Sequence, residues 1–159
     1  MQQTARLYHC IWFYSFYSVI FICVCLLTII FIKRRDFIMT MKQIKNAAKM
    51  MRKTCQPKND VTDDKIDPIN DGVFIEEKGV KCYIACIMKM ANTMKNNKFS
   101  YESAIKKADL LLPDELKEPA KAALTACRKV PDTYKDMCDA AFYITKCVYE
   151  HNPAIFYFP

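Results

Sequence analysis

The chain has 159 residues, about the length of one domain, and 52% of them are hydrophobic, which excludes an intrinsically disordered chain. There are 24 basic and 17 acidic residues, so the formal net charge is +7. Only two glycines are present, too few for the glycine-rich loops that bind phosphates or dinucleotides.

The first 39 residues are predicted to be a hydrophobic leader. Residues 10–32 contain no charged side chain, and as a helix they would be about 34 Å long, enough to cross a bilayer. The run is longer than the apolar core of a secretory signal, about 7–15 residues. It ends at Lys33-Arg34-Arg35 rather than at small residues, and this charge order favours a cytoplasmic C-terminal side.

Three interpretations of the leader stay open: an atypical signal peptide, a signal anchor, or an incorrectly assigned start. We favour a leader that is absent from the mature protein over a membrane anchor formed by residues 10–32. The cysteines inside this run are interpreted as apolar filler rather than as ligands: Cys10, Cys23 and Cys25.

The domain proper is expected to span residues 40–159. Thr40 and Gln43 form a capping box, which predicts a helix that ends at Pro57. One face of that helix carries apolar residues at helical spacing, namely Met41, Ile44, Ala48, Met51 and Cys55. Residues 56–75 are polar, and we expect a loop there with at most one short helix, after Thr62.

Four further helices follow in the prediction. The first covers residues 76–94 and is ended by Asn96-Asn97. Ser100 is the expected N-cap of the second, which runs to about residue 110. The third covers about 113–130 and the fourth about 133–151. No stretch alternates with period two over a useful length, so no strands are predicted and the fold class is all-α.

From Thr40 onward the charges are mixed, with 20 basic and 16 acidic residues and no basic face, so we expect no nucleic-acid partner. This part contains six cysteines, with 26, 3, 40, 10 and 8 residues between them: Cys55, Cys82, Cys86, Cys127, Cys138 and Cys147. An even number in a small domain indicates disulfides and an oxidising compartment. Zinc is disfavoured because C-x-x-C pairs are missing, and no metal or cofactor is expected.

Helix geometry narrows the cysteine pairing without choosing one. Cys82 and Cys86 lie about 40° apart around a helix axis and share one face, so bonds to two different helices would join three helices. Cys138 and Cys147 lie about 180° apart and should reach different neighbours. Six cysteines allow 15 pairings.

The cysteine spacing resembles that of the six-cysteine insect odorant-binding proteins of the PBP/GOBP type. The amino-acid sequence around the cysteines is similar to that family as well, in the segments "MMRKTCQPK", "KCYIACIMKMANTMKN", "LLPDELKEPAKAALTAC" and the closing "FYFP". The resemblance covers about residues 40–159. It implies about six short helices around an apolar cavity, with the pairs Cys55–Cys86, Cys82–Cys138 and Cys127–Cys147.

No catalytic constellation is visible, and we expect no enzyme. His151 is the only histidine of the domain, and a histidine at a helix C-terminus is more often a favourable charge than a general base. An acidic group lacks the spacing of a calcium loop and is interpreted as a solvated loop: Asp60, Asp63, Asp64, Asp67 and Asp71.

An apolar cavity held by disulfides can take a small hydrophobic ligand. The resemblance implies that most wall residues follow the third cysteine or lie on the last helix and the apolar tail, and we add Leu124 by its position one turn before Cys127. The expected set is Met88, Ala91, Thr93, Met94, Phe99, Leu111, Leu124, Ala141, Phe142, Val148, Phe156 and Phe158. Thr93 is the expected polar contact for a ligand.

The predicted function is a secreted carrier that binds odorants or pheromones and takes them through aqueous fluid to chemosensory receptors. The expected partners are a small hydrophobic ligand and a membrane chemoreceptor, and the expected state is a monomer or weak homodimer. Two alternatives stay open: a non-olfactory carrier of the same fold, and a membrane-anchored interaction module that retains residues 10–32. A lytic amphipathic protein is disfavoured by the six cysteines and the low charge.

Overall fold

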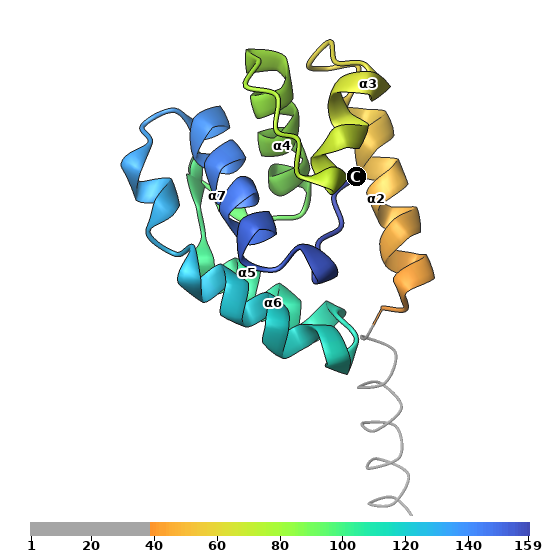
Figure 1. Cartoon of the computed structure of the whole chain (residues 1–159), viewed down its shortest axis with the longest axis vertical. Coiled ribbons are helices and arrows are strands. Elements are labelled where there is room, and N and C mark those ends of the chain that lie inside the picture. The colour runs from red at the N-terminus through yellow and green to blue at the C-terminus, as the bar shows by residue number, and fades with distance from the viewer. Residues whose placement is uncertain (1–38) are drawn as a thin grey trace, which may run out of the picture. The chain divides into compact units, whose positions relative to one another are not determined.

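In the computed structural model the described part of the chain is residues 39–159, so the predictions for residues 10–32 lie outside it (Figure 1). This part is mainly helical, as predicted. Its α-helices are α2 Met41–Cys55, α3 Asp63–Ile66, α4 Lys78–Met90, α5 Tyr101–Leu111, α6 Asp114–Ala126 and α7 Met137–His151. Short 3-10 helices are η1 Asp67–Asp71, η2 Val130–Thr133 and η3 Pro153–Ile155. Among these described helices, none has the length and hydrophobicity needed to cross a bilayer.

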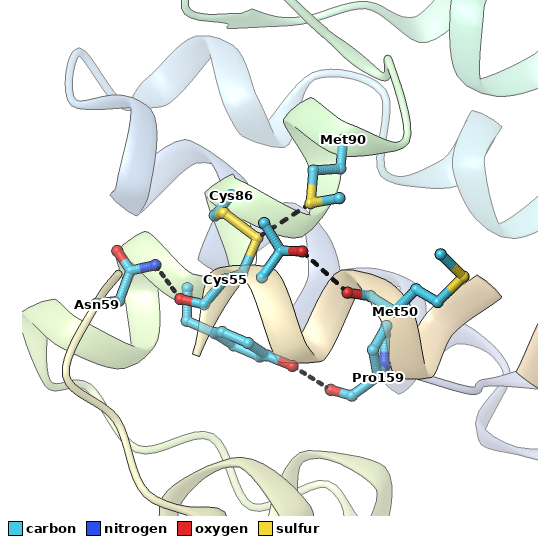
Figure 2. The surroundings of a disulfide bond; sticks show 8 residues. Met50, Cys55, Asn59, Cys86, Met90 and Pro159 are labelled. Carbon is cyan, nitrogen blue, oxygen red and sulfur yellow. Dashed lines mark hydrogen bonds between the residues drawn. A yellow bond between two sulfur atoms is a disulfide. The ribbon is translucent and has the colours of Figure 1, made fainter. Parts of the chain in front are cut away.

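Helix α2 begins at the predicted capping box. The Thr40 hydroxyl accepts from the Gln43 backbone N–H at 3.3 Å, and the Gln43 side chain accepts from the Thr40 N–H at 2.8 Å. The helix ends where the Asn59 side chain donates to the carbonyl of Cys55 at 2.7 Å (Figure 2). Both ends are therefore fixed by side chains that lie next to the helix in the sequence.

The acidic loop is held by one arginine. Arg52 of α2 contacts the carboxylates of Asp63 at 2.6 Å and Asp67 at 2.7 Å. Its hydrogen bond is the main reason why the pKa of Asp63 lies below the usual value, with a second bond from Gln56 contributing. Two aspartates of the acidic group, Asp63 and Asp67, thus link α3 and η1 to α2.

A small hairpin follows α4, which ends at Met90 instead of the predicted residue 94. Strands β1 Met94–Lys95 and β2 Lys98–Phe99 pair in antiparallel fashion, with Met94 opposite Phe99. Asn96 and Asn97 between them have φ values of 49° and 61°, the left-handed conformation that a tight hairpin turn needs and asparagine tolerates. The prediction of no strands was wrong here, because two-residue strands are too short to produce a visible alternation.

Two of the later helix boundaries also differ from the prediction. Helix α6 ends at Ala126, and Pro119 lies inside it without ending it. Helix α7 starts at Met137 rather than near residue 133, because Asp136 accepts from the N–H groups of Cys138 at 2.8 Å and Asp139 at 3.1 Å.

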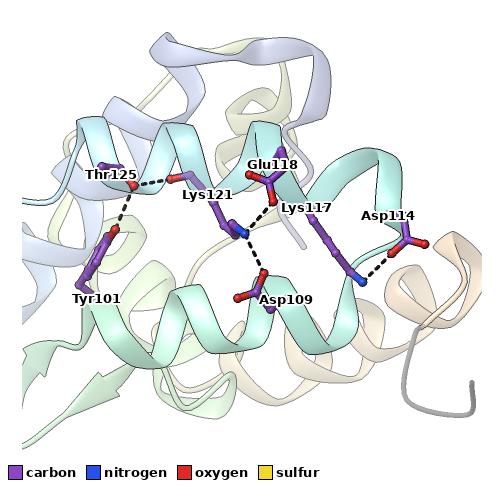
Figure 3. A network of polar contacts seen from close by, with 7 residues as sticks. All are labelled: Tyr101, Asp109, Asp114, Lys117, Glu118, Lys121 and Thr125. Carbon is purple, nitrogen blue, oxygen red and sulfur yellow. Dashed lines mark hydrogen bonds and ion pairs between the residues drawn. The ribbon is translucent and has the colours of Figure 1, made fainter. Parts of the chain in front are cut away.

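Three disulfides join the long helices, in the pairs that the family resemblance implies. Cys55–Cys86 joins α2 to α4, Cys82–Cys138 joins α4 to α7, and Cys127–Cys147 joins the end of α6 to α7. The two cysteines of α4 do bond to different helices, as their shared face required. Helix α5 has no cysteine and packs on α6 through the Asp109–Lys121 ion pair at 3.0 Å and the Tyr101–Thr125 hydroxyl contact at 2.9 Å (Figure 3).

The C-terminal tail returns into the core between the helices (Figure 1). Asn70 holds the backbone of Phe158 with two hydrogen bonds, accepting from its N–H at 2.8 Å and donating to its carbonyl at 2.9 Å. The buried Tyr83 hydroxyl donates to the Pro159 oxygen at 2.6 Å. A chain end usually frays, but these contacts tie this one down.

Removing one disulfide should reveal how strongly the framework stabilises the domain. We expect Cys82→Ala/Cys138→Ala to lower the free energy of unfolding by about 2–5 kcal/mol, because the unfolded chain gains entropy. The bond spans 56 residues, against 20 for Cys127–Cys147, so the matched pair Cys127→Ala/Cys147→Ala should cost about 1 kcal/mol less. Urea unfolding followed by circular dichroism measures both. A larger loss for the shorter loop would contradict the entropic explanation.

Alkaline pH should weaken the anchor of the tail. Burial raises the pKa of Tyr83 to about 12 from its model-compound value of 10.0. The folded state therefore favours the neutral phenol, and this stabilisation is complete below pH 10 and is lost as the pH rises through about 12. Between these values the native protein should lose more stability than Tyr83→Phe, as measured by urea unfolding. Tyr157→Phe, at a partly exposed tyrosine, serves as the control and should follow the native curve.

Candidate ligand-binding cavity

A cavity of about 580 Å³ lies between α2, α4, α5, α6 and the tail. Helices α2 and α4 contribute Ile44, Ala47, Met51, Met88 and Met90 to its wall, and the segment after α4 contributes Ala91, Thr93 and Phe99. Helices α5 and α6 contribute Ala104, Lys107, Ala108, Leu111, Ala120 and Leu124, with Leu112 between them. The wall is completed by Met39, Val148, Ile155, Phe156 and Tyr157.

Alanines on three of the surrounding helices help to explain why the space is not filled. Ala104 and Ala108 lie one turn apart on α5, Ala47 faces the cavity from α2, and Ala120 faces it from α6. Disulfides join α2 to α4 and the end of α6 to α7, so α2 and α6, which carry Ala47 and Ala120, are each held by a cross-link, whereas α5 is held by its packing on α6. Met51, Met88 and Met90 supply flexible thioethers that can repack around occupants of different shape.

The methionine wall lies directly on a disulfide. The sulfur of Met90 is 3.5 Å from Cys55 Sγ, and Figure 2 shows the Cys55–Cys86 bond beside it. A disulfide sulfur carries no hydrogen, so this is a van der Waals contact between two polarizable atoms rather than a hydrogen bond. The Cys55–Cys86 disulfide therefore packs directly behind Met90 in this part of the cavity wall.

The tail closes one side of the cavity. Phe156 packs edge-on against Tyr149 with ring centres 5.2 Å apart and against Phe74 at 6.5 Å. Tyr157 is partly exposed, and the Lys45 ammonium lies 5.7 Å from the centre of its ring. These contacts and the Asn70 hydrogen bonds hold the tail in place as a wall of the cavity, and no disulfide cross-links it to the helices.

Eight of the twelve expected residues line this cavity. They come from the segment after Cys86, from α5 and α6, and from the end of the chain: Met88, Ala91, Thr93, Phe99, Leu111, Leu124, Val148 and Phe156. Their contact with a ligand remains a prediction. The other four, Met94, Ala141, Phe142 and Phe158, are buried elsewhere, and the structure does not place them in the wall.

The position of each of the four along its element explains the difference. Ala141 and Phe142 lie in the first half of α7, which the Cys82–Cys138 bond holds against α4, whereas Val148 lies two turns later, at the cavity. Met94 was predicted on the apolar face of a helix, but α4 ends at Met90 and Met94 lies in strand β1 instead. Phe158 packs against Tyr83, with ring centres 6.2 Å apart, in the core beneath Phe156.

Sequence reasoning missed the contribution of α2 and of the alanines. The apolar stripe of α2 was visible, and its Ile44 and Met51 could have been assigned to the cavity on that ground. Lys107 gave no such signal, because a lysine in a predicted helix suggests a solvated position. Ile155 and Tyr157 belong to the tail that was predicted to fold inward.

The polar groups of the wall are few. Thr93 donates its hydroxyl hydrogen to the Met88 carbonyl at 3.0 Å, so that hydrogen already has an acceptor and is not available to a ligand. Lys107 and Tyr157 are the other polar side chains among the described wall residues. His151 is exposed at the end of α7. Within residues 39–159, no group of three His, Cys, Asp or Glu side chains is arranged to hold a metal ion.

Known proteins of similar sequence and fold share this domain. General odorant-binding protein 72 of Anopheles gambiae is 37% identical over 120 residues, which are 76% of this chain and 98% of that protein. General odorant-binding protein 19a of Drosophila melanogaster is 33% identical over 123 residues, 76% of this chain and 84% of that one.

Solved structures agree with the sequence matches. Odorant Binding Protein 4 of Chrysopa pallens superposes with a TM-score of 0.71 at 32% identity, covering 77% of this chain and 100% of its own. Odorant binding protein 5 of Apis mellifera gives 0.72 at 31% identity, covering 77% and 99%. Since these whole chains correspond to the described domain, a unit of this length folds on its own.

The family model matches nearly all of the described domain. The PBP/GOBP family model aligns with residues 38–151, which include all six cysteines of the disulfide framework. That match is more than half of the chain, and the sequence relatives agree with it. The chain therefore belongs to the PBP/GOBP family of odorant-binding proteins.

Proposed function

We propose that the domain binds a small hydrophobic molecule in its cavity and carries it through an aqueous fluid. The observation that carries this proposal is the cavity of about 580 Å³, whose described wall is apolar except at Thr93, Lys107 and Tyr157. A concave apolar site with a few polar groups is what such ligands require. The similar proteins are odorant-binding proteins, which supports a volatile or pheromone-like ligand.

The proposed place of action is outside the cell, in a fluid such as that around chemosensory neurons. Three disulfides in a small domain support an oxidising compartment. In this proposal the leader is absent from the mature protein, which acts as a monomer or weak homodimer, has no catalytic role and delivers its ligand to a membrane chemoreceptor. A carrier of the same fold outside olfaction is the alternative, and the tissue of expression separates the two.

A membrane-anchored interaction module is the second candidate, favoured by the uncharged residues 10–32. N-terminal sequencing of the natural protein distinguishes the two. A mature start near residue 40 supports the soluble carrier, and an intact leader in the membrane fraction supports the anchored module.

Filling the cavity should abolish binding. We expect Ala120→Phe to weaken binding of the fluorescent probe N-phenyl-1-naphthylamine at least about tenfold, because the added ring occupies space that the probe needs. Ala122→Phe makes the same change on the exposed face of the same helix and should bind the probe like the native protein. Fluorescence titration measures both. Equal affinities of the two variants would place the probe outside this cavity.

Removing the tail should open the cavity while sparing the fold. We expect deletion of residues 154–159 to weaken probe binding, since Ile155, Phe156 and Tyr157 are lost from the wall. The helical circular dichroism signal should largely remain, because all three disulfides lie before the deleted segment.

A point variant repeats this test without shortening the chain. Asn70→Ala removes the two hydrogen bonds to Phe158 and should weaken probe binding in the same direction. Unchanged affinity in both proteins would remove the tail from the binding site.

A further inference from the structure

One charged side chain faces the apolar cavity. Among the described wall residues, Lys107 alone carries a charge, and no acidic residue is present. It lies on α5 three residues after Ala104 and four before Leu111, which also line the cavity, so it shares their helical face. Its neighbour Lys106 is exposed and does not belong to the wall. The position of Lys107 is therefore directed toward the cavity rather than toward open solvent.

Lys107 has no ionic partner among residues 39–159, although acidic residues are frequent on the adjoining surface. Asp109 and Glu118 both contact Lys121, at 3.0 and 2.7 Å, and Asp114 contacts Lys117 at 2.6 Å (Figure 3). The carboxylates between α5 and α6 are thus engaged by the lysines of α6. Lys107, a half-buried residue, is therefore available to an anion that enters the cavity.

A cation beside an apolar wall discriminates between ligands. A fully apolar molecule that covers the ammonium displaces water from it without offering a hydrogen-bond acceptor, and this desolvation makes binding less favourable. A carboxylate in the same place replaces that water with a charge-assisted hydrogen bond. A lysine side chain lays its methylene groups on apolar surface and keeps its ammonium at the wet edge, so the anion would sit at the edge of the cavity.

We propose that Lys107 makes the cavity selective for long-chain apolar molecules that end in a carboxylate, with the carboxylate at the ammonium and the chain among the alanines and methionines. This inference rests on the proposed function, because it assigns a ligand class to the same cavity. The Thr93 hydroxyl already donates to Met88 and does not compete for the anion. The nearby cation Lys45, beside Tyr157, adds positive potential on the side of the tail.

The test compares two ligands that differ only in their head group. Dodecanoate and dodecanol each displace N-phenyl-1-naphthylamine from residues 39–159 at neutral pH, and the ratio of their affinities is measured. In Lys107→Met this ratio should fall about fivefold or more in favour of the alcohol, because the charge is lost while the apolar stem remains. Dodecanol itself should bind Lys107→Met within about twofold of the native protein.

Two further variants make the result specific. Lys106→Met removes an equal charge from the exposed neighbour and should leave the ratio unchanged, whereas Lys107→Arg should keep it close to native. Lys107→Glu should reverse the selectivity, so that dodecylammonium binds more tightly than dodecanoate. These variants also show whether a change comes from the site or from the general charge of the domain.

The outcomes separate this inference from the function on which it rests. An unchanged ratio in Lys107→Met, or an equal fall in Lys106→Met, overturns the role of Lys107 while the cavity still binds the probe and dodecanol. Failure of the native protein to bind the probe or either ligand overturns the carrier function, and with it the assignment of the carboxylate.

Discussion

The arrangement of the domain depends on two cysteines one turn apart on α4. Because Cys82 and Cys86 share a face but bond to different partners, α4 is fixed to α7 and to α2 at once. The bond between Cys127 and Cys147 extends this framework to the end of α6. The framework limits how closely α2, α4 and the end of α6 can approach one another, and short side chains on α2, α5 and α6 leave space between them. The cavity thus follows from where the covalent bonds are placed as much as from which residues line it.

Much of this arrangement could be predicted from local sequence signals. The capping box at Thr40 and the N-cap at Ser100 marked the starts of α2 and α5, because a cap is decided by neighbours in the chain. The pairing of the cysteines is a long-range property. Helix geometry only narrowed it, and the resemblance to a known family supplied the choice.

The cavity wall was less predictable, because it depends on where along a helix a residue meets its neighbours. Phe142 and Val148 both belong to α7, yet only Val148 reaches the cavity, and nothing in the local pattern separates them. Met94 depended on a helix end that came four residues earlier than expected, at Met90. The role proposed for Lys107 could not be predicted for a different reason. It depends on the absence of an ionic partner among the described residues, and only the packing of α5 on α6 shows that Asp109 pairs with Lys121 instead.

The non-covalent attachment of the tail has a kinetic consequence. All three disulfides end at or before Cys147, so no cross-link holds the segment that completes the wall, and its attachment depends on contacts such as the hydrogen bonds of Asn70. For the carrier proposed above, ligand exchange would then need only a local opening, governed by the contacts of Asn70 and Tyr83 with the tail. For the proposed carrier, substitutions in the few terminal residues should therefore change the residence time of a ligand more than they change the stability of the helical framework.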